Sequence, residues 1–239
     1  MLELEDLLHL VRQLHDRMRQ RVLEAAQSRS IEELSQVVGE DGGDTIFAID
    51  RESERELLEY ACRELACREP IVLIAEGLPG GKLVVPANAD ETDCRWRIIV
   101  DPIDGTRCLM FQKRSGWILT GVARNRGVQT SLQDIELAVQ TEIPILKQNQ
   151  CDQLWAMRGG GACAERYDLL SGESRSIPLQ PTRASTIQYG FAAISRFFPG
   201  LRDVLAKIDD EVVTGVLGPR KPDSTMTFED QYPSTGGQV

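Results

Sequence analysis

A buried strand that runs directly into two carboxylates constrains this chain more than any other feature. The apolar run Ile98–Val100 is typical of a buried strand, and it leads into the sequence Asp-Pro-Ile-Asp-Gly-Thr at residues 101–106. Hard divalent cations prefer several carboxylate and carbonyl oxygens that converge on one point. A sharp turn could direct Asp101, the carbonyl of Ile103 and Asp104 toward such a point, and the N–H groups that follow could hold an anion. The stretch therefore predicts a metal ion beside a phosphate.

Acidic residues also end two earlier predicted strands. Thr45–Ile49 is predicted to be a strand that ends at Asp50, and Ile71–Ala75 is predicted to be a strand that ends at Glu76. Open α/β sheets place their binding sites at strand ends. An acid at one strand end often marks only the solvated end, but three in succession are harder to explain in that way. We therefore expect these acids and Asp101 to share one site.

Helical spacing of apolar residues predicts one amphipathic helix over residues 3–26 and another over 51–67. A capping box at Ser30 predicts a short helix between them. His9 and His15 fall within the first helix, and we expect both at surface or boundary positions rather than as ligands.

Strands are predicted at 116–124 and near 134–146 and 153–157, which suggests a meander. The triple glycine at 159–161 predicts a turn that could mark a lobe boundary. Beyond it, a second α/β unit is expected to begin with a strand at Ile187–Ala193 and a helix at Leu201–Ile208.

Composition limits which classes of partner the chain is expected to bind and which compartment it is expected to occupy. The 239-residue chain has a formal net charge of −10, which argues against a general nucleic-acid binder or a protein that binds acidic membranes. No apolar run approaches the roughly 20 residues that span a bilayer, and the N-terminus is acidic rather than basic. The six cysteines show no C-x-x-C spacing, so we expect reduced, mostly buried thiols. These observations predict a cytoplasmic protein.

The motif at 101–106 resembles the signature of the inositol monophosphatase superfamily, which comprises metal-dependent phosphomonoesterases. Thr45–Asp50 followed by Glu54, the segment Ile74–Glu76 and the turn at 159–162 resemble three further segments of that family. The resemblance covers most of residues 40–239, and it is specific at three motifs.

The resemblance implies two or more Mg²⁺ ions and a role for each matching residue. Glu76, Asp101 and the carbonyl of Ile103 would hold a first Mg²⁺, and Asp101 and Asp104 would share in a second. Asp50 and the hydroxyl of Thr106 would orient and activate the attacking water. The backbone N–H groups of Gly105 and Thr106 would hold the phosphate.

The chain departs from the family pattern at three places. Gly77 stands where the family has a second glutamate, which could alter metal affinity. Arg107 follows the motif, where it could pair with a second substrate phosphate or form an ion pair at the rim. The sequence ends at Ser234–Val239, before the Trp-Asp-x-Ala motif whose aspartate completes the family's second metal site. We expect a truncated product, with weak activity or none if the truncation is real.

The expected fold is α/β, an αβαβα sandwich of the sugar-phosphatase type with an incomplete C-terminal lobe. Lobes are expected at 1–183, with the metal site, and at 184–239. The expected function is hydrolysis of a small phosphorylated alcohol, either an inositol phosphate or a related sugar phosphate, by a possible homodimer. Two alternatives stay open: a catalytically weak or inactive metal-binding relative, and an enzyme similar to bisphosphate nucleotidases or fructose bisphosphatases.

Overall fold

The computed structural model describes residues 2–41, 44–185 and 200–218. The chain divides into two compact units, Met1–Leu179 and Gln180–Val239.

In the second unit the structure describes the helix α5 (Arg202–Leu217). This helix confirms the prediction at Leu201–Ile208 and extends beyond it. The predicted strand at Ile187–Ala193 and the segment Ser234–Val239 lie outside the described residues.

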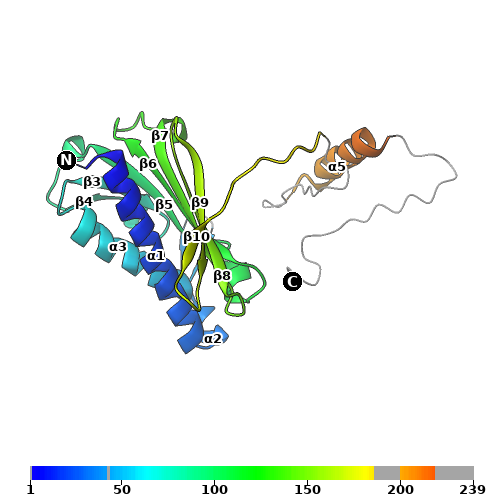
Figure 1. The fold of residues 1–239 in the computed structure, drawn as a ribbon, viewed down its shortest axis with the longest axis horizontal. Coiled ribbons are helices and arrows are strands. Elements are labelled where there is room, and N and C mark those ends of the chain that lie inside the picture. Colours follow the sequence, from blue (N-terminus) through cyan, green and yellow to red (C-terminus); the bar gives the residue numbers. More distant parts are fainter. Residues whose placement is uncertain (1, 42–43, 186–199, 219–239) are drawn as a thin grey trace. The chain divides into compact units, whose positions relative to one another are not determined.

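One eight-stranded sheet forms the framework of the first unit (Figure 1). In spatial order its strands are β10, β9, β8, β7, β6, β5, β3 and β4, and every neighbouring pair is antiparallel except β3 with β5. The strands are β3 (Ile71–Ala75), β4 (Lys82–Val85), β5 (Trp96–Asp104), β6 (Gly116–Arg124), β7 (Ile135–Ile143), β8 (Gln150–Met157), β9 (Gly161–Asp168) and β10 (Ser174–Ser176). The expected α/β fold with a mostly antiparallel sheet is confirmed, and β4, β9 and β10 add to the strands that were predicted.

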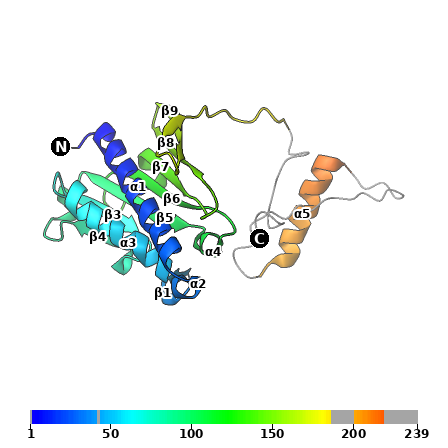
Figure 2. The same cartoon turned by 60° about the horizontal axis from the view of Figure 1, so that its bottom comes forward.

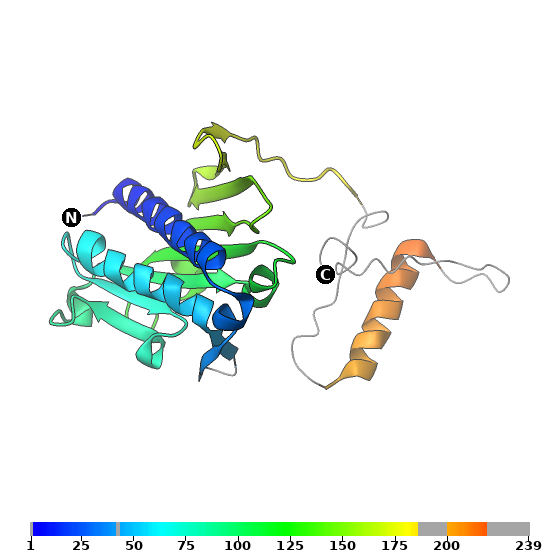
Figure 3. The same cartoon turned by 90° about the horizontal axis from the view of Figure 1, so that it is seen from below.

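Two long helices, α1 (Leu4–Ser28) and α3 (Ala48–Tyr60), lie side by side across one face of this sheet (Figures 2 and 3). The buried stripe of α1 consists of Leu7, Val11, Leu14, Met18 and Val22, all fully buried. Burying each large apolar side chain contributes about 1.5–3 kcal/mol, so this stripe is what holds α1 on the sheet. After α3 the chain continues as a π-helical segment, Ala61–Leu65.

The segment before α3 folds as a short helix and a hairpin. The helix α2 (Ile31–Leu34) begins with the predicted capping box, in which the N–H of Glu33 donates to the side-chain oxygen of Ser30 at 3.2 Å. The two strands of the hairpin are β1 (Val37–Asp41) and β2 (Asp44–Phe47).

The predicted strand end at Asp50 is wrong. The strand β2 ends at Phe47, and Asp50 lies in the first turn of α3. Its carboxylate Oδ2 accepts the N–H of Phe47 at 2.8 Å. A helix start leaves backbone N–H groups without helical partners, and an acid three residues into the helix satisfies one of them. This local capping makes the chain turn into a helix three residues earlier than the apolar pattern suggests.

The triple glycine connects β8 to β9 as a hairpin within the first unit, so it is no lobe boundary. Gly159 has φ 83° and Gly161 has φ 78°, a left-handed region that glycine enters without a steric cost. The glycines are therefore required by the tight connection between two paired strands.

The expectations for His15 and for the cysteines are also corrected. His15 is 0% exposed, because α1 turns this position toward the sheet, whereas His9 is exposed as expected. All six cysteines are free thiols, but only Cys94 and Cys151 are buried.

Candidate metal and phosphate site

The parallel pairing of β3 with β5 brings two of the predicted acids to the same end of the sheet. Ile74 pairs with Ile99 and Ala75 pairs with Val100, so Glu76 and Asp101 are the next residues along these neighbouring strands. Neighbouring strands lie about 4.8 Å apart. The pairing therefore brings two acidic residues that are 25 positions apart in sequence to the same end of two neighbouring strands.

A bulge reshapes the end of β5 around the motif. Asp101 pairs with Leu119 and Asp104 pairs with Trp117, so three steps on β5 match two on β6. The Oδ1 atom of Asp101 accepts the N–H of Ile103 at 3.1 Å, which fixes the carboxylate over the bulge. Bulges bend a strand and redirect its side chains, and here the bulge separates a half-buried Asp101 from an exposed Asp104.

Gly105 turns the chain from β5 into the short helix α4 (Thr106–Met110). Its φ of 87° is in the left-handed region, so the abrupt turn requires a glycine. The turn places Thr106 at the start of α4, directly after the bulge.

Thr106 and Asp50 meet across 56 positions of sequence. The hydroxyl of Thr106 donates to Oδ1 of Asp50 at 2.9 Å, and the carbonyl oxygen of Ile103 is also 2.9 Å from this hydroxyl. Burial raises the pKa of the Asp50 carboxyl, while the hydrogen bonds from Phe47 and Thr106 oppose part of that rise. The structure thus pairs the two residues for which a role in water activation was expected.

Two contacts near this pair were not foreseen from the sequence, although Glu54 and Gly77 themselves belong to segments that were compared with the family pattern. The buried hydroxyl of Ser53 donates to the carbonyl of Pro102 at 3.2 Å, which ties α3 to the bulge. The carboxylate of Glu54 lies against Gly77, whose φ is 81°. Periodicity marks Ser53 and Glu54 only as helix positions, because their partners lie on strands distant in sequence.

Arg107 is exposed at the start of α4. Its guanidinium carbon lies 5.8 Å from the ring centroid of Phe47, the residue that donates its N–H to Asp50. A cation over an aromatic face at this distance is attracted by the ring. Arg107 is therefore positioned by the segment that also holds Asp50.

The donor set is chemically suited to a hard cation. Glu76, Asp101 and Asp104 offer carboxylate oxygens, and Ile103 offers a carbonyl. Within the three described ranges, no three His, Cys, Asp or Glu side chains are arranged as a metal-binding group. Mg²⁺ is usually held by one or two carboxylates together with waters and substrate phosphates rather than by an all-protein cage. Two carboxylates beside a strand bulge fit that mode of binding.

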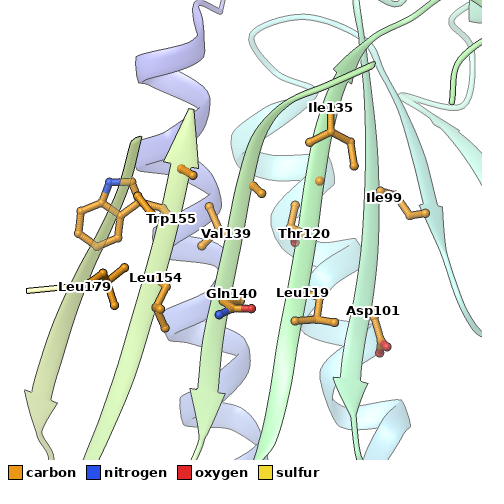
Figure 4. A pocket seen from close by; sticks show the side chains of 14 residues that line it. Ile99, Asp101, Leu119, Thr120, Ile135, Val139, Gln140, Leu154, Trp155 and Leu179 are labelled. Atoms are coloured by element: carbon orange, nitrogen blue, oxygen red, sulfur yellow. The ribbon is translucent and has the colours of Figure 1, made fainter. Parts of the chain in front are cut away.

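An apolar groove of about 480 Å³ lies on the sheet face that α1 and α3 do not cover, across β5, β6, β7 and β8 (Figure 4). Ile99, Leu119 and Leu154 line it, and Ile99 is 37% exposed. Of the predicted site residues, Asp101 lines the groove. The groove therefore adjoins the carboxylates without containing the Asp50–Thr106 pair.

No protein-family profile matches this sequence, and no curated protein sequence matches it. Among solved structures, fructose-1,6-bisphosphatase from Leishmania major in holo form is similar, with TM-score 0.53, 16% identity, and coverage of 71% of this chain and 52% of that chain. Inositol monophosphatase II from Staphylococcus aureus MSSA476 is similar with TM-score 0.54 and 16% identity, and the match covers 90% of this chain and 64% of that chain.

These two likenesses show that the chain shares a fold with these two proteins, and that fold is the one expected from the sequence resemblance. The match spans about half the length of the Leishmania enzyme and less than two thirds of the Staphylococcus enzyme. No described helix has the length and apolar character that crossing a membrane requires.

Proposed function

We propose that this chain belongs to a metal-dependent phosphomonoesterase that hydrolyses a small phosphorylated alcohol. The observation that carries the proposal is the Asp50–Thr106 hydrogen bond, which lies directly after the bulge that carries Asp101 and Asp104. A hydroxyl that is held by the half-buried carboxylate of Asp50, next to the acidic residues at the end of β5, suits hydrolysis of an anionic ester better than simple binding.

In this proposal Glu76, Asp101 and the carbonyl of Ile103 would hold one Mg²⁺, and Asp101 and Asp104 would contribute to a second. Bound Mg²⁺ would neutralise the phosphoryl oxygens and lower the pKa of bound water. The chain's negative charge makes this neutralisation necessary, since its net charge of −10 would otherwise disfavour a phosphate dianion.

Asp50 and Thr106 act on the attacking water. A hydroxyl has one hydrogen and two acceptor lone pairs, so Thr106 can donate to Asp50 while it accepts a hydrogen bond from water. The raised pKa of Asp50 makes its carboxylate a better proton acceptor than an exposed aspartate. Asp50 therefore orients Thr106 and receives the proton.

The N–H groups of Gly105 and Thr106 bind the phosphate in this proposal, and Arg107 contacts the rest of the substrate. An inositol phosphate or related sugar phosphate is the proposed class. Arg107 keeps a second class open, because a guanidinium at this rim could pair with a second phosphate of a sugar or nucleotide bisphosphate. The similarity to a solved fructose-1,6-bisphosphatase supports testing that class.

Mg²⁺-dependent phosphate release from inositol phosphate, fructose bisphosphate and adenosine bisphosphate tests the proposal. Asp101→Asn should abolish release, whereas Asp93→Asn, at an exposed aspartate outside the proposed site, should leave it unchanged. Release that persists in Asp101→Asn would refute the site. If the folded chain binds Mg²⁺ but releases no phosphate from any of the three, the alternative of a non-catalytic metal-binding relative is favoured.

We also propose a cytoplasmic location and a homodimer. Exposed free thiols at Cys62, Cys67 and Cys163 support a reducing compartment, where such thiols persist. The homodimer rests on the family resemblance, and light scattering of the purified protein measures it directly.

A further inference from the structure

Glu54 is an acid that α3 buries beside the proposed site. It lies one helical turn after Asp50 and is 7% exposed. Its Oε2 atom forms an ion pair with the guanidinium of Arg51 at 2.9 Å. Burying a charged carboxylate is costly, so a buried acid at this place requires an interaction that compensates for the lost hydration.

The Glu54 carboxylate reaches from α3 to the turn that follows β3. Both of its oxygens lie within 3.0 Å of the position that a Cβ atom on Gly77 would occupy. Gly77 directly follows Glu76, so a helix carboxylate and the backbone beside a proposed metal ligand are packed against each other. Any side chain at position 77 would displace the Glu54 carboxylate.

We propose that Glu54 is a positioning residue for cation binding: its carboxylate, seated on Gly77, holds the turn that carries Glu76 and adds negative charge beside it. This inference rests on the proposed function, because it needs a cation at Glu76 and Asp101. Groups that orient metal ligands without touching the metal typically change metal affinity 10–100-fold when they are altered.

The test measures Mn²⁺ binding to the full chain, with electron paramagnetic resonance used to quantify the free ion. Glu54→Gln keeps the shape of the side chain and removes its charge, and it should weaken Mn²⁺ binding about 10–100-fold. Glu52→Gln is the matched control. Glu52 is on the same helix, is 8% exposed and pairs with Arg29 at 2.8 Å. It should bind Mn²⁺ within about twofold of the unaltered chain.

A second variant acts on the same contact without changing Glu54. Gly77→Ala should displace the Glu54 carboxylate and weaken Mn²⁺ binding, and because φ at Gly77 is 81° the alanine also strains the turn beside Glu76. The melting temperature without metal is measured for each variant. A merely structural role would lower that temperature and leave the affinity of the folded protein unchanged.

The outcomes separate this inference from the proposed function. If the unaltered chain binds no Mn²⁺, both the role of Glu54 and the proposed function are overturned. If the unaltered chain binds Mn²⁺ and the two variants Glu54→Gln and Glu52→Gln have equal Mn²⁺ affinity, only the role of Glu54 is overturned. A loss of Mn²⁺ affinity in Glu54→Gln that is absent in Glu52→Gln supports the role of Glu54. If Glu54→Gln does not fold, an unchanged Mn²⁺ affinity in Gly77→Ala overturns the role of Glu54 instead.

Discussion

Replacing His15 by glutamine should reduce the loss of stability that this protein suffers on acidification. The ring of His15 is fully buried, with Nδ1 2.9 Å from the hydroxyl of Thr141 and Nε2 2.7 Å from the hydroxyl of Thr120. A neutral imidazole has one donor and one acceptor, which matches two hydroxyl partners. Burial, and secondarily the positive charge of Arg19, lowers the pKa of His15 to about 3.

The magnitude follows from linkage. In the unfolded chain His15 titrates at about 6.5, so below that pH the unfolded state binds a proton that the folded state rejects. Stability is therefore present above about pH 6.5 and is lost progressively as the pH falls toward the folded pKa of about 3. At about 1.4 kcal/mol per pH unit, acidification to about pH 5 costs about 2 kcal/mol from this group.

Urea unfolding followed by tryptophan fluorescence measures this, because Trp96, Trp117 and Trp155 lie on β5, β6 and β8 of the sheet. Between about pH 7 and pH 5, the unaltered chain should lose about 2 kcal/mol more than His15→Gln. The same carboxylates titrate in both proteins, so their contribution to the pH dependence of stability cancels in the comparison. Equal losses in the two proteins would show that His15 is not neutral and buried as described.

Three other changes test the site and the sheet. Thr106→Val should lower phosphate release at least about 100-fold, with Thr106→Ser as the active control, because the Thr106 hydroxyl is the group that donates to Asp50. A small effect would contradict the role in water activation. The rate should fall as pH falls through the raised pKa of Asp50, above the usual aspartate value, and a pH–rate profile that stays flat there would exclude Asp50 as the base. Gly121→Ala should cost about 1–3 kcal/mol in urea unfolding, because its Cβ would lie 2.7 Å from Cδ1 of Ile135, and an unchanged midpoint would show that Ile135 yields freely.

Much of the candidate site could be predicted from local sequence patterns. The strands β3 and β6 begin and end at the predicted residues, because short apolar runs bounded by polar or glycine residues identify buried strands. The motif that ends β5 was recognised because carboxylates and a glycine are adjacent in sequence there. The start of α3 was missed because apolar periodicity does not reveal that Asp50 caps its own helix.

The sequence by itself determined which residue types are available: oxygen ligands at strand ends, a left-handed glycine, and an amphipathic helix to cover a sheet. Only the tertiary structure decided which of them meet. The parallel register of β3 and β5 juxtaposes Glu76 with Asp101, and the packing of α3 on the sheet brings Glu54 onto Gly77. Periodicity describes one element at a time, whereas register and helix packing minimise the free energy of elements distant in sequence. The physical reason is that these contacts exist only after the apolar faces of the strands and helices have been buried together.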